Sequence, residues 1–198
     1  MPTDPAQKRA KGPRKPRAMT ETRLRNIATW YCQRYLVSSA KLTDHLEKRL
    51  RREVADADAR RALAEKIPEI VDKLAGLGLV NDREAASARL RSALRSGYAP
   101  RAAVNVAARG AMVGREVVDA ELGTAIGEAL PELRRDEDEE AASPAEQAAL
   151  ALKRARRGPW RSRPQDETSK RRDAGWLQRR GFPLDAVRAA LDIDPEEE

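Results

Sequence analysis

The sequence predicts an all-α fold, an elongated array of three small tri-helical, helix-turn-helix-like modules in series. Alanine, leucine and arginine dominate the 198 residues, and runs of valine, isoleucine and threonine, which favour strands, are absent. Aromatic residues make up 4% of the chain and charged residues 36%. A chain of this length can bury a core, but so few bulky side chains favour several small modules over one large core.

Composition and charge divide the chain into six segments. We expect a disordered basic arm at 1–19, helical modules at 20–80, 81–125 and 145–192, an acidic linker at 126–144 and an acidic tail at 193–198. The arm is rich in proline and has no apolar period, as in disordered segments. Either it attaches electrostatically to phosphate or it is a solubilising tail.

The first helix is expected to begin at Thr20 or Thr22. Its apolar stripe follows the helical period and comprises Leu24, Ile27, Ala28, Tyr31 and Tyr35. Trp30 and Cys32 flank this stripe. Because the aromatic residues follow the helical period, we favour core packing for them over base stacking.

A second helix is capped by Ser38 or Ser39, and its leucines recur every four residues. Residues 53–67 are rich in alanine and alternating charge and predict a continuation of this helix. Pro68 then fits the first turn of a new helix, where its missing N–H is not needed.

The stretch 76–97 closes one helix and begins another. Gly76 and Gly78 are candidate C-terminal caps, and Asn81 or Asp82 is a candidate N-cap. The new helix has an apolar face, ends at Gly97 and is followed by a helix that Pro100 begins. The apolar face comprises Ala86, Leu90, Ala93 and Leu94.

An Arg-Gly pair occurs twice and indicates an internal repeat. Arg109-Gly110 is expected to end the helix at 102–108, and Arg180-Gly181 precedes a short C-terminal helix. Repeats too small to bury their own faces imply stacked modules. Residues 123–144 are expected to form a linker or a frayed helix.

The loop of the third module places Trp160 between Arg157 and Arg161. This tryptophan could stack on a base or pack over the loop as a lid, and we favour packing.

Leu79, Val80, Asn81 and Asp82 precede an arginine-rich helix, and Gly97, Tyr98, Ala99, Pro100 and Arg101 follow it. This order resembles the RecX family, the bacterial modulators of the RecA recombinase, which shows a Leu-Leu-Asp-Asp turn, an arginine-rich helix and Gly-Tyr-Gly-Pro-Arg. The family's closing motif is matched by Trp176, Leu177, Arg179, Arg180, Gly181 and Phe182, and its opening motif by Ser38, Ser39 and Leu42. Asn81, Ala99, Asp173 and Gly175 depart from the family pattern.

The resemblance implies a function. RecX-like proteins are understood to lie in the groove of the RecA–single-stranded-DNA filament and to modulate, mostly inhibit, the recombinase, ATPase and coprotease activities of RecA. The implied setting is homologous recombination, DNA repair and the SOS response. The implied partner is the RecA filament, with single-stranded DNA contacted through it, and we expect a cytoplasmic monomer without a membrane segment.

The charge distribution also favours a polyanionic partner. The formal net charge is +7, and the runs of acidic residues at 136–140 and 192–198 leave a larger positive excess on the remaining helical body. We expect the arginines of modules two and three to carry the partner contact: Arg89, Arg91, Arg95, Arg101, Arg171, Arg172, Arg179 and Arg180. A general helical DNA-binding protein without a RecA partner, and a helical adaptor for an acidic protein, are the alternatives.

The sequence contains no pattern typical of an enzyme. One cysteine, Cys32, and one histidine, His45, exclude an intramolecular disulfide and a zinc-ligand cluster. No phosphate-binding glycine loop or nucleophile elbow occurs. We therefore expect no catalytic residue, no metal and no cofactor.

Overall fold

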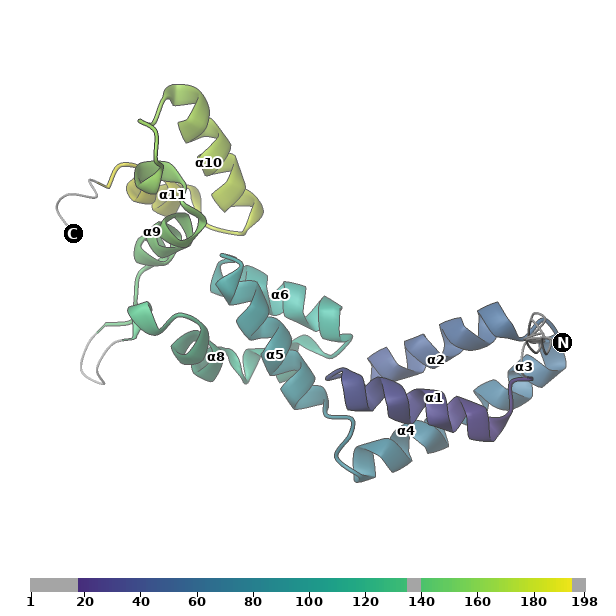
Figure 1. Cartoon of the computed structure of the whole chain (residues 1–198). Helices are drawn as coiled ribbons and strands as arrows, with labels where there is room; N and C mark the ends of the chain where they lie inside the picture. Colours follow the sequence, from purple (N-terminus) through teal and green to yellow (C-terminus); the bar gives the residue numbers. More distant parts are fainter. Residues whose placement is uncertain (1–17, 135–139, 194–198) are drawn as a thin grey trace, which may run out of the picture.

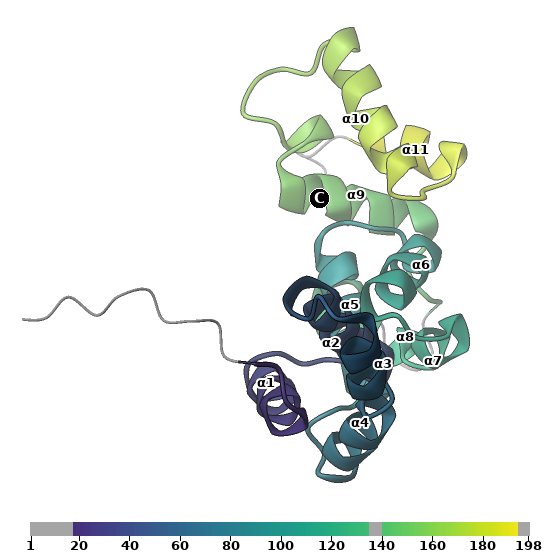
Figure 2. The same ribbon diagram turned by 90° about the vertical axis from the view of Figure 1, so that its right-hand side faces the viewer.

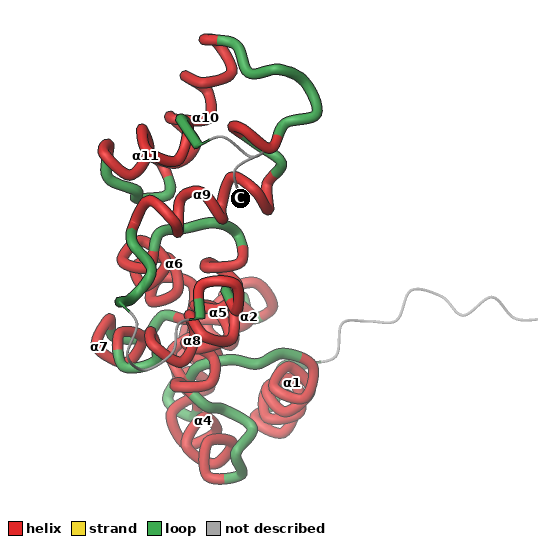
Figure 3. The backbone as a smooth tube through the Cα atoms, turned by 90° about the vertical axis from the view of Figure 1, so that its left-hand side faces the viewer, coloured by secondary structure: helices red, strands yellow, loops and turns green. Residues whose placement is uncertain are grey.

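A computed structural model of the chain describes residues 18–134 and 140–193, and these residues form helices without any strand (Figure 3). The all-α prediction is confirmed. The basic arm up to residue 17, residues 136–139 of the acidic run and residues 194–198 of the acidic tail lie outside the described residues. The α-helices are α1 (Glu21–Arg34), α2 (Ser39–Glu53), α3 (Ala57–Ala64), α4 (Ile67–Gly76), α5 (Asp82–Arg95), α6 (Pro100–Ala111), α7 (Arg115–Asp119), α8 (Leu122–Ala129), α9 (Pro144–Ala155), α10 (Glu167–Arg179) and α11 (Leu184–Leu191).

The buried side chains gather in three clusters that follow one another along the chain. The first cluster joins α1 to α4, the second joins α5 to α8, and the third joins α9 to α11 and includes Ala99. In Figure 1 the helices α5, α6 and α8 lie between the first group and the last. A series of small helical modules, rather than one large core, is therefore consistent with the structure.

The buried face of α1 differs from the predicted stripe. Leu24, Ala28 and Cys32 are buried, whereas Tyr35 is exposed. These three buried residues recur every four positions, so they share one face of α1. This face packs against the rest of the first cluster. Tyr35 is the C-cap residue and has an extended backbone, with φ −132° and ψ 138°. It therefore lies outside the helix and does not continue the apolar stripe of α1.

The composition of residues 53–67 predicts that they continue α2, but they do not. The helix ends at Glu53, Val54 is extended, and the side chain of Asp56 accepts a hydrogen bond of 2.7 Å from the amide of Ala59 to begin α3. A capping aspartate offers the backbone an alternative to continuous helix. The first group therefore contains four helices instead of three.

The predicted caps at Asn81 and Gly78 are confirmed, whereas Gly76, also predicted as a cap, is the last residue inside α4 and is not among the residues with positive φ. The side chain of Asn81 accepts a hydrogen bond of 3.0 Å from the amide of Glu84, and the predicted apolar face of α5 is buried. Gly78 and Gly97 have φ of 72° and 82°, which glycine adopts without a steric penalty.

The two Arg-Gly pairs are not structurally equivalent. Arg109 and Gly110 lie inside α6, which ends only at Ala111, before the left-handed Met112. Arg180 and Gly181, in contrast, do follow the end of α10, and Gly181 has φ of 88°. A glycine in a helix costs about 1 kcal/mol relative to alanine and need not end it.

The segment after α7 is more ordered than the sequence suggests. Residues 123–144 were expected to form a linker or a frayed helix, but α8 buries Ala125 and Ala129 and packs against α5. Small side chains allow this close packing although α8 carries little apolar bulk. The boundaries proposed for the modules remain predictions.

Gly181 lies where the third group of helices touches the second. A Cβ atom at this position would lie 2.5 Å from the Cβ of Ala102 in α6, and the positive φ adds strain to any side chain. Gly76, at the end of α4, has no atom within 4 Å of such a Cβ. The two glycines therefore provide a matched pair of sites.

We predict that Gly181→Ala lowers the free energy of unfolding by about 1–3 kcal/mol, because the left-handed backbone and the contact with Ala102 both oppose the methyl group. Gly76→Ala is the control and should leave stability unchanged or slightly raised. Urea titration followed by circular dichroism measures both. Equal stability of the two variants would contradict the close approach at Gly181.

Candidate nucleic-acid interface

Arg91 is engaged within the protein. Its guanidinium lies 3.1 Å from a carboxylate oxygen of Glu84 and 3.1 Å from one of Glu128, and it donates to Ser87 at 2.8 Å. These contacts tie α5 to α8. Although Arg91 was expected to contact a partner, its charge is already shared between two carboxylates.

Arg180 is also engaged within the protein, between two aromatic rings. Its guanidinium carbon lies 3.8 Å from the centroid of a Trp176 ring and 5.3 Å from that of Tyr98, and its Nε donates to the carbonyl of Ser96 at 3.2 Å. Burial lowers the pKa of Arg180 from its usual value. Such cation–π contacts contribute about 0.5–2 kcal/mol each.

The two motifs that carry the family resemblance therefore meet in space. The amide of Ala99 donates to the carbonyl of Arg180 at 2.9 Å, and Ala99 packs in the same buried cluster as Phe182. Ala99 has φ of −59° and ψ of 148°, which any residue adopts before proline, so this departure from the family pattern needs no glycine. We call this contact between Tyr98, Ala99, Trp176 and Arg180 the joint.

Four arginines around α6 remain exposed, and none has a carboxylate partner within the described residues: Arg89, Arg101, Arg109 and Arg179. Three of them belong to the predicted set. Arg109 was missed, because the sequence interpretation placed a helix end there.

Two of these arginines, Arg109 and Arg179, line one hollow beside α6, whereas Arg101 lines another hollow at the start of α6. Positions 101, 105 and 109 are four residues apart and share one face of α6, a span of roughly 12 Å along the axis. Arg179 of α10 faces the first hollow, which is lined by Tyr98, Ala102, Asn105, Val106, Ala108, Arg109 and Arg179. Arg89 of α5 reaches the end of α6, since a Cβ on Gly110 would lie 3.7 Å from its Cδ. We call this surface the basic groove.

The other predicted arginines lie elsewhere. Arg95 lines a separate cleft between α5 and α9, together with Arg154, which forms an ion pair of 2.6 Å with Glu132. Arg171 and Arg172 are exposed in the middle of α10. Of the predicted set, Arg179 therefore lines the hollow of the basic groove, Arg101 and Arg89 lie on the helices α6 and α5 beside it, and the other members lie elsewhere.

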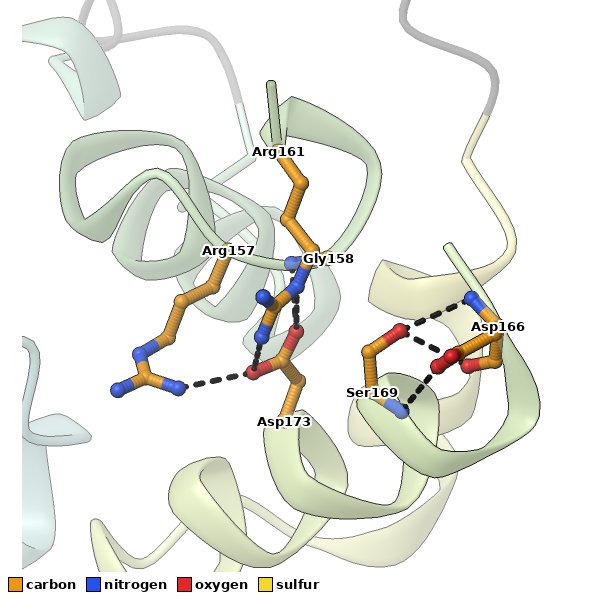
Figure 4. Close-up of polar contacts among 6 residues, drawn as sticks. All are labelled: Arg157, Gly158, Arg161, Asp166, Ser169 and Asp173. Atoms are coloured by element: carbon orange, nitrogen blue, oxygen red, sulfur yellow. Dashed lines mark hydrogen bonds and ion pairs between the residues drawn. The ribbon is translucent and has the colours of Figure 1, made fainter. Parts of the chain in front are cut away.

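Asp173 organises the loop of the third module, and the sequence analysis noted it only as a departure from the family pattern. Its carboxylate is fully buried and accepts hydrogen bonds from Arg157 at 2.9 Å, from Arg161 at 2.7 and 2.9 Å, and from the amide of Gly158 at 2.8 Å (Figure 4). Asp173 lies four residues before the buried Leu177 and therefore on the same face of the helix. This spacing could have predicted that Asp173 is buried.

The electrostatics of Asp173 favour its charged form. Burial alone would raise the pKa of this carboxyl, but the hydrogen bonds from Arg161, Gly158 and Arg157 outweigh burial and hold its pKa below the usual value. Trp160, in the same loop, is half-buried in the third cluster with the Lys153 ammonium 5.9 Å from its ring centroid. The packing interpretation of Trp160 is confirmed.

A comparison with known proteins points to the same family as the sequence motifs. No protein-family model matches the chain. Over 194 residues, it is 28% identical to a Myxococcus xanthus (strain DK1622) protein called Regulatory protein RecX, and the alignment covers 96% of each chain. This similarity supports a RecX family assignment.

A RecX family assignment agrees with the place of the motifs in the structure. The matched residues around Tyr98 and Arg180 build the joint, which places the start of α6 next to the end of α10. Within residues 18–134 and 140–193, no group of three or more metal-ligating side chains comes together. No helix in these ranges is long and apolar enough to cross a membrane.

We predict that Asp173→Asn lowers the free energy of unfolding by about 2 kcal/mol, because an amide cannot accept all the hydrogen bonds that the carboxylate accepts. Asp192→Asn is the matched control: Asp192 is exposed and 3.6 Å from Lys170, so its loss should matter little. Thermal and urea unfolding measure both variants.

The effect of Asp173→Asn should depend on pH. A carboxyl with a lowered folded pKa adds stability above its unfolded pKa of about 3.9, and this contribution is lost as the pH falls through the folded value. The stability difference from the wild-type protein should therefore be full at pH 7 and shrink below about pH 4. A difference that stays constant down to pH 2 would contradict a charged Asp173.

Proposed function

We propose that this protein is a RecX-like regulatory protein that binds the RecA–single-stranded-DNA filament and reduces the recombinase, ATPase and coprotease activities of RecA during DNA repair. The observation that carries the proposal is the similarity to Regulatory protein RecX along 96% of both chains. The proposed role is regulatory and not enzymatic, in the cytoplasm, and the protein acts as a monomer.

The basic groove supports this function as the contact surface. Its exposed arginines have planar guanidiniums that bind phosphate or carboxylate at two points. Charges without internal partners repel one another, and an anionic partner relieves that repulsion. α6 itself contains no acidic residue, so its outer face adds no competing charge.

The serial arrangement of the helices supports the same function. The view of Figure 2 shows the helices from α1 and α4 to α10 and α11 stacked along one direction. A filament presents the same surface at regular intervals, and an extended chain of modules can contact several of them. A compact reader of a single DNA site has less need for this shape.

A general helical DNA-binding protein is the second candidate function. The unpaired arginines of the basic groove favour it equally, because they fit the phosphates of any nucleic acid. The two functions differ in their need for RecA, and an assay with RecA separates them.

The deciding experiment is an assay of DNA-dependent ATP hydrolysis by RecA with the triple variant Arg101→Glu, Arg109→Glu and Arg179→Glu. We expect inhibition by the wild-type protein, and at least about tenfold more of the variant should be needed for the same effect, a loss of at least about 1.4 kcal/mol. The reason is that charge reversal replaces attraction by repulsion along the whole groove.

The matched control reverses three exposed arginines away from the groove, Arg61, Arg163 and Arg188. Its net charge equals that of the groove variant, and it should inhibit RecA nearly as well as the wild-type protein. Circular dichroism should show unchanged helicity in both. If the groove variant inhibits RecA at wild-type concentrations, the contact surface lies elsewhere. If the wild-type protein binds DNA but does not change ATP hydrolysis by RecA, the second candidate function is favoured.

A further inference from the structure

Large apolar side chains are exposed together at the C-terminal end of α1. Six such side chains are exposed among the described residues, and three of them fall within seven positions: Trp30 at 58%, Tyr35 at 48% and Leu36 at 48%. An exposed cluster of this kind marks an interaction site more often than a single exposed residue does. The helical period of α1 predicts core packing for its aromatic residues, and this prediction is wrong for Trp30 and Tyr35.

The rings are held in place by contacts along α1 and with α2. Tyr31 stacks on His45 of α2 with centroids 3.9 Å apart and planes 6° apart, and Tyr35 lies 5.1 Å from Tyr31. Trp30 and Arg34 are one helical turn apart, and the Arg34 guanidinium carbon lies 5.8 Å from the Trp30 ring centroid. These contacts thus form two groups along α1, the rings of Tyr31 and Tyr35 with His45, and the Trp30 ring with Arg34.

The charge beside Trp30 is positive. Arg34 is exposed and has no carboxylate partner within the described residues. Its guanidinium therefore remains available to an anion next to the Trp30 ring.

We propose that the end of α1 is a stacking platform for the unpaired bases of single-stranded DNA, with Trp30 as the stacking ring and Arg34 as the phosphate contact. Every base has a π-face, so an exposed indole accepts any of them, and a guanidinium beside it matches the adjoining phosphate. An apolar protein partner would not need the unpaired arginine over the ring. This platform goes beyond the proposed function, because it contacts unpaired bases directly and does not require RecA.

The test uses the full chain, without RecA, and two oligonucleotides of the same length: one of thymidines and one of abasic deoxyribose phosphates. The two carry equal phosphate charge, so only the bases differ. We expect the wild-type protein to bind the thymidine strand roughly tenfold more tightly than the abasic strand, with quenching of tryptophan fluorescence. Trp160 and Trp176 are half-buried, so Trp30 should account for most of the quenching.

Trp30→Leu should lose both the preference for bases and the quenching, and Trp30→Phe should retain part of the preference. Leu77→Ser is the control, because Leu77 is another apolar side chain, 65% exposed, elsewhere in the first group of helices. Trp30 is exposed, so Trp30→Leu should fold normally, which circular dichroism checks. Equal wild-type affinity for both strands, or an unchanged preference in Trp30→Leu, would overturn the proposal.

Two further outcomes separate this platform from other uses of the same surface. If the wild-type protein sediments as a dimer without DNA and Trp30→Leu as a monomer, the surface joins two copies of the chain and the platform is refuted. If Trp30→Leu loses inhibition of RecA but keeps its preference for bases, the surface binds protein and the platform is likewise refuted. The basic-groove variant should retain the base preference, so the failure of one proposal leaves the other open to test.

Discussion

The joint between Tyr98, Ala99, Trp176 and Arg180 is the interaction on which the candidate interface depends. It holds one guanidinium between two aromatic rings and adds a backbone hydrogen bond from Ala99 to Arg180. These contacts fix the turn before α6 against the end of α10. Because Arg109 comes from α6 and Arg179 from α10, the position of the groove that both line depends on the contacts of the joint.

The arginines of the chain differ in whether a carboxylate lies close enough to form an ion pair with them. Arg91 and Arg157 form ion pairs with carboxylates and connect helices, whereas Arg101 and Arg109 are exposed and form no ion pair with an acidic side chain of the described residues. A paired arginine contributes to the fold and offers little to a partner. An exposed arginine without a carboxylate partner adds no ion pair to the fold and remains available to bind an anion.

The site could be predicted in part, and the misses have local causes. Arg101 and Arg179 were found from their motifs, but Arg109 was assigned to a helix end because it precedes a glycine. Asp173 was treated as a departure among basic residues, although its spacing from Leu177 places it on the buried face of α10. Trp30 was assigned to the edge of the core, because the sequence does not show which side of α1 its neighbours cover.

The sequence by itself determined the helical class, the N-cap of α5 and the apolar faces of α2 and α5, because these depend on residues within four or five positions of one another. Asn81 as a cap and the buried leucines of α2 and α5 are of this kind. The tertiary structure alone decided which arginines are free. The partners of Arg91 and Arg180 lie as many as 37 and 84 residues away in the chain. No local pattern encodes such distances, since they follow from how the helices pack.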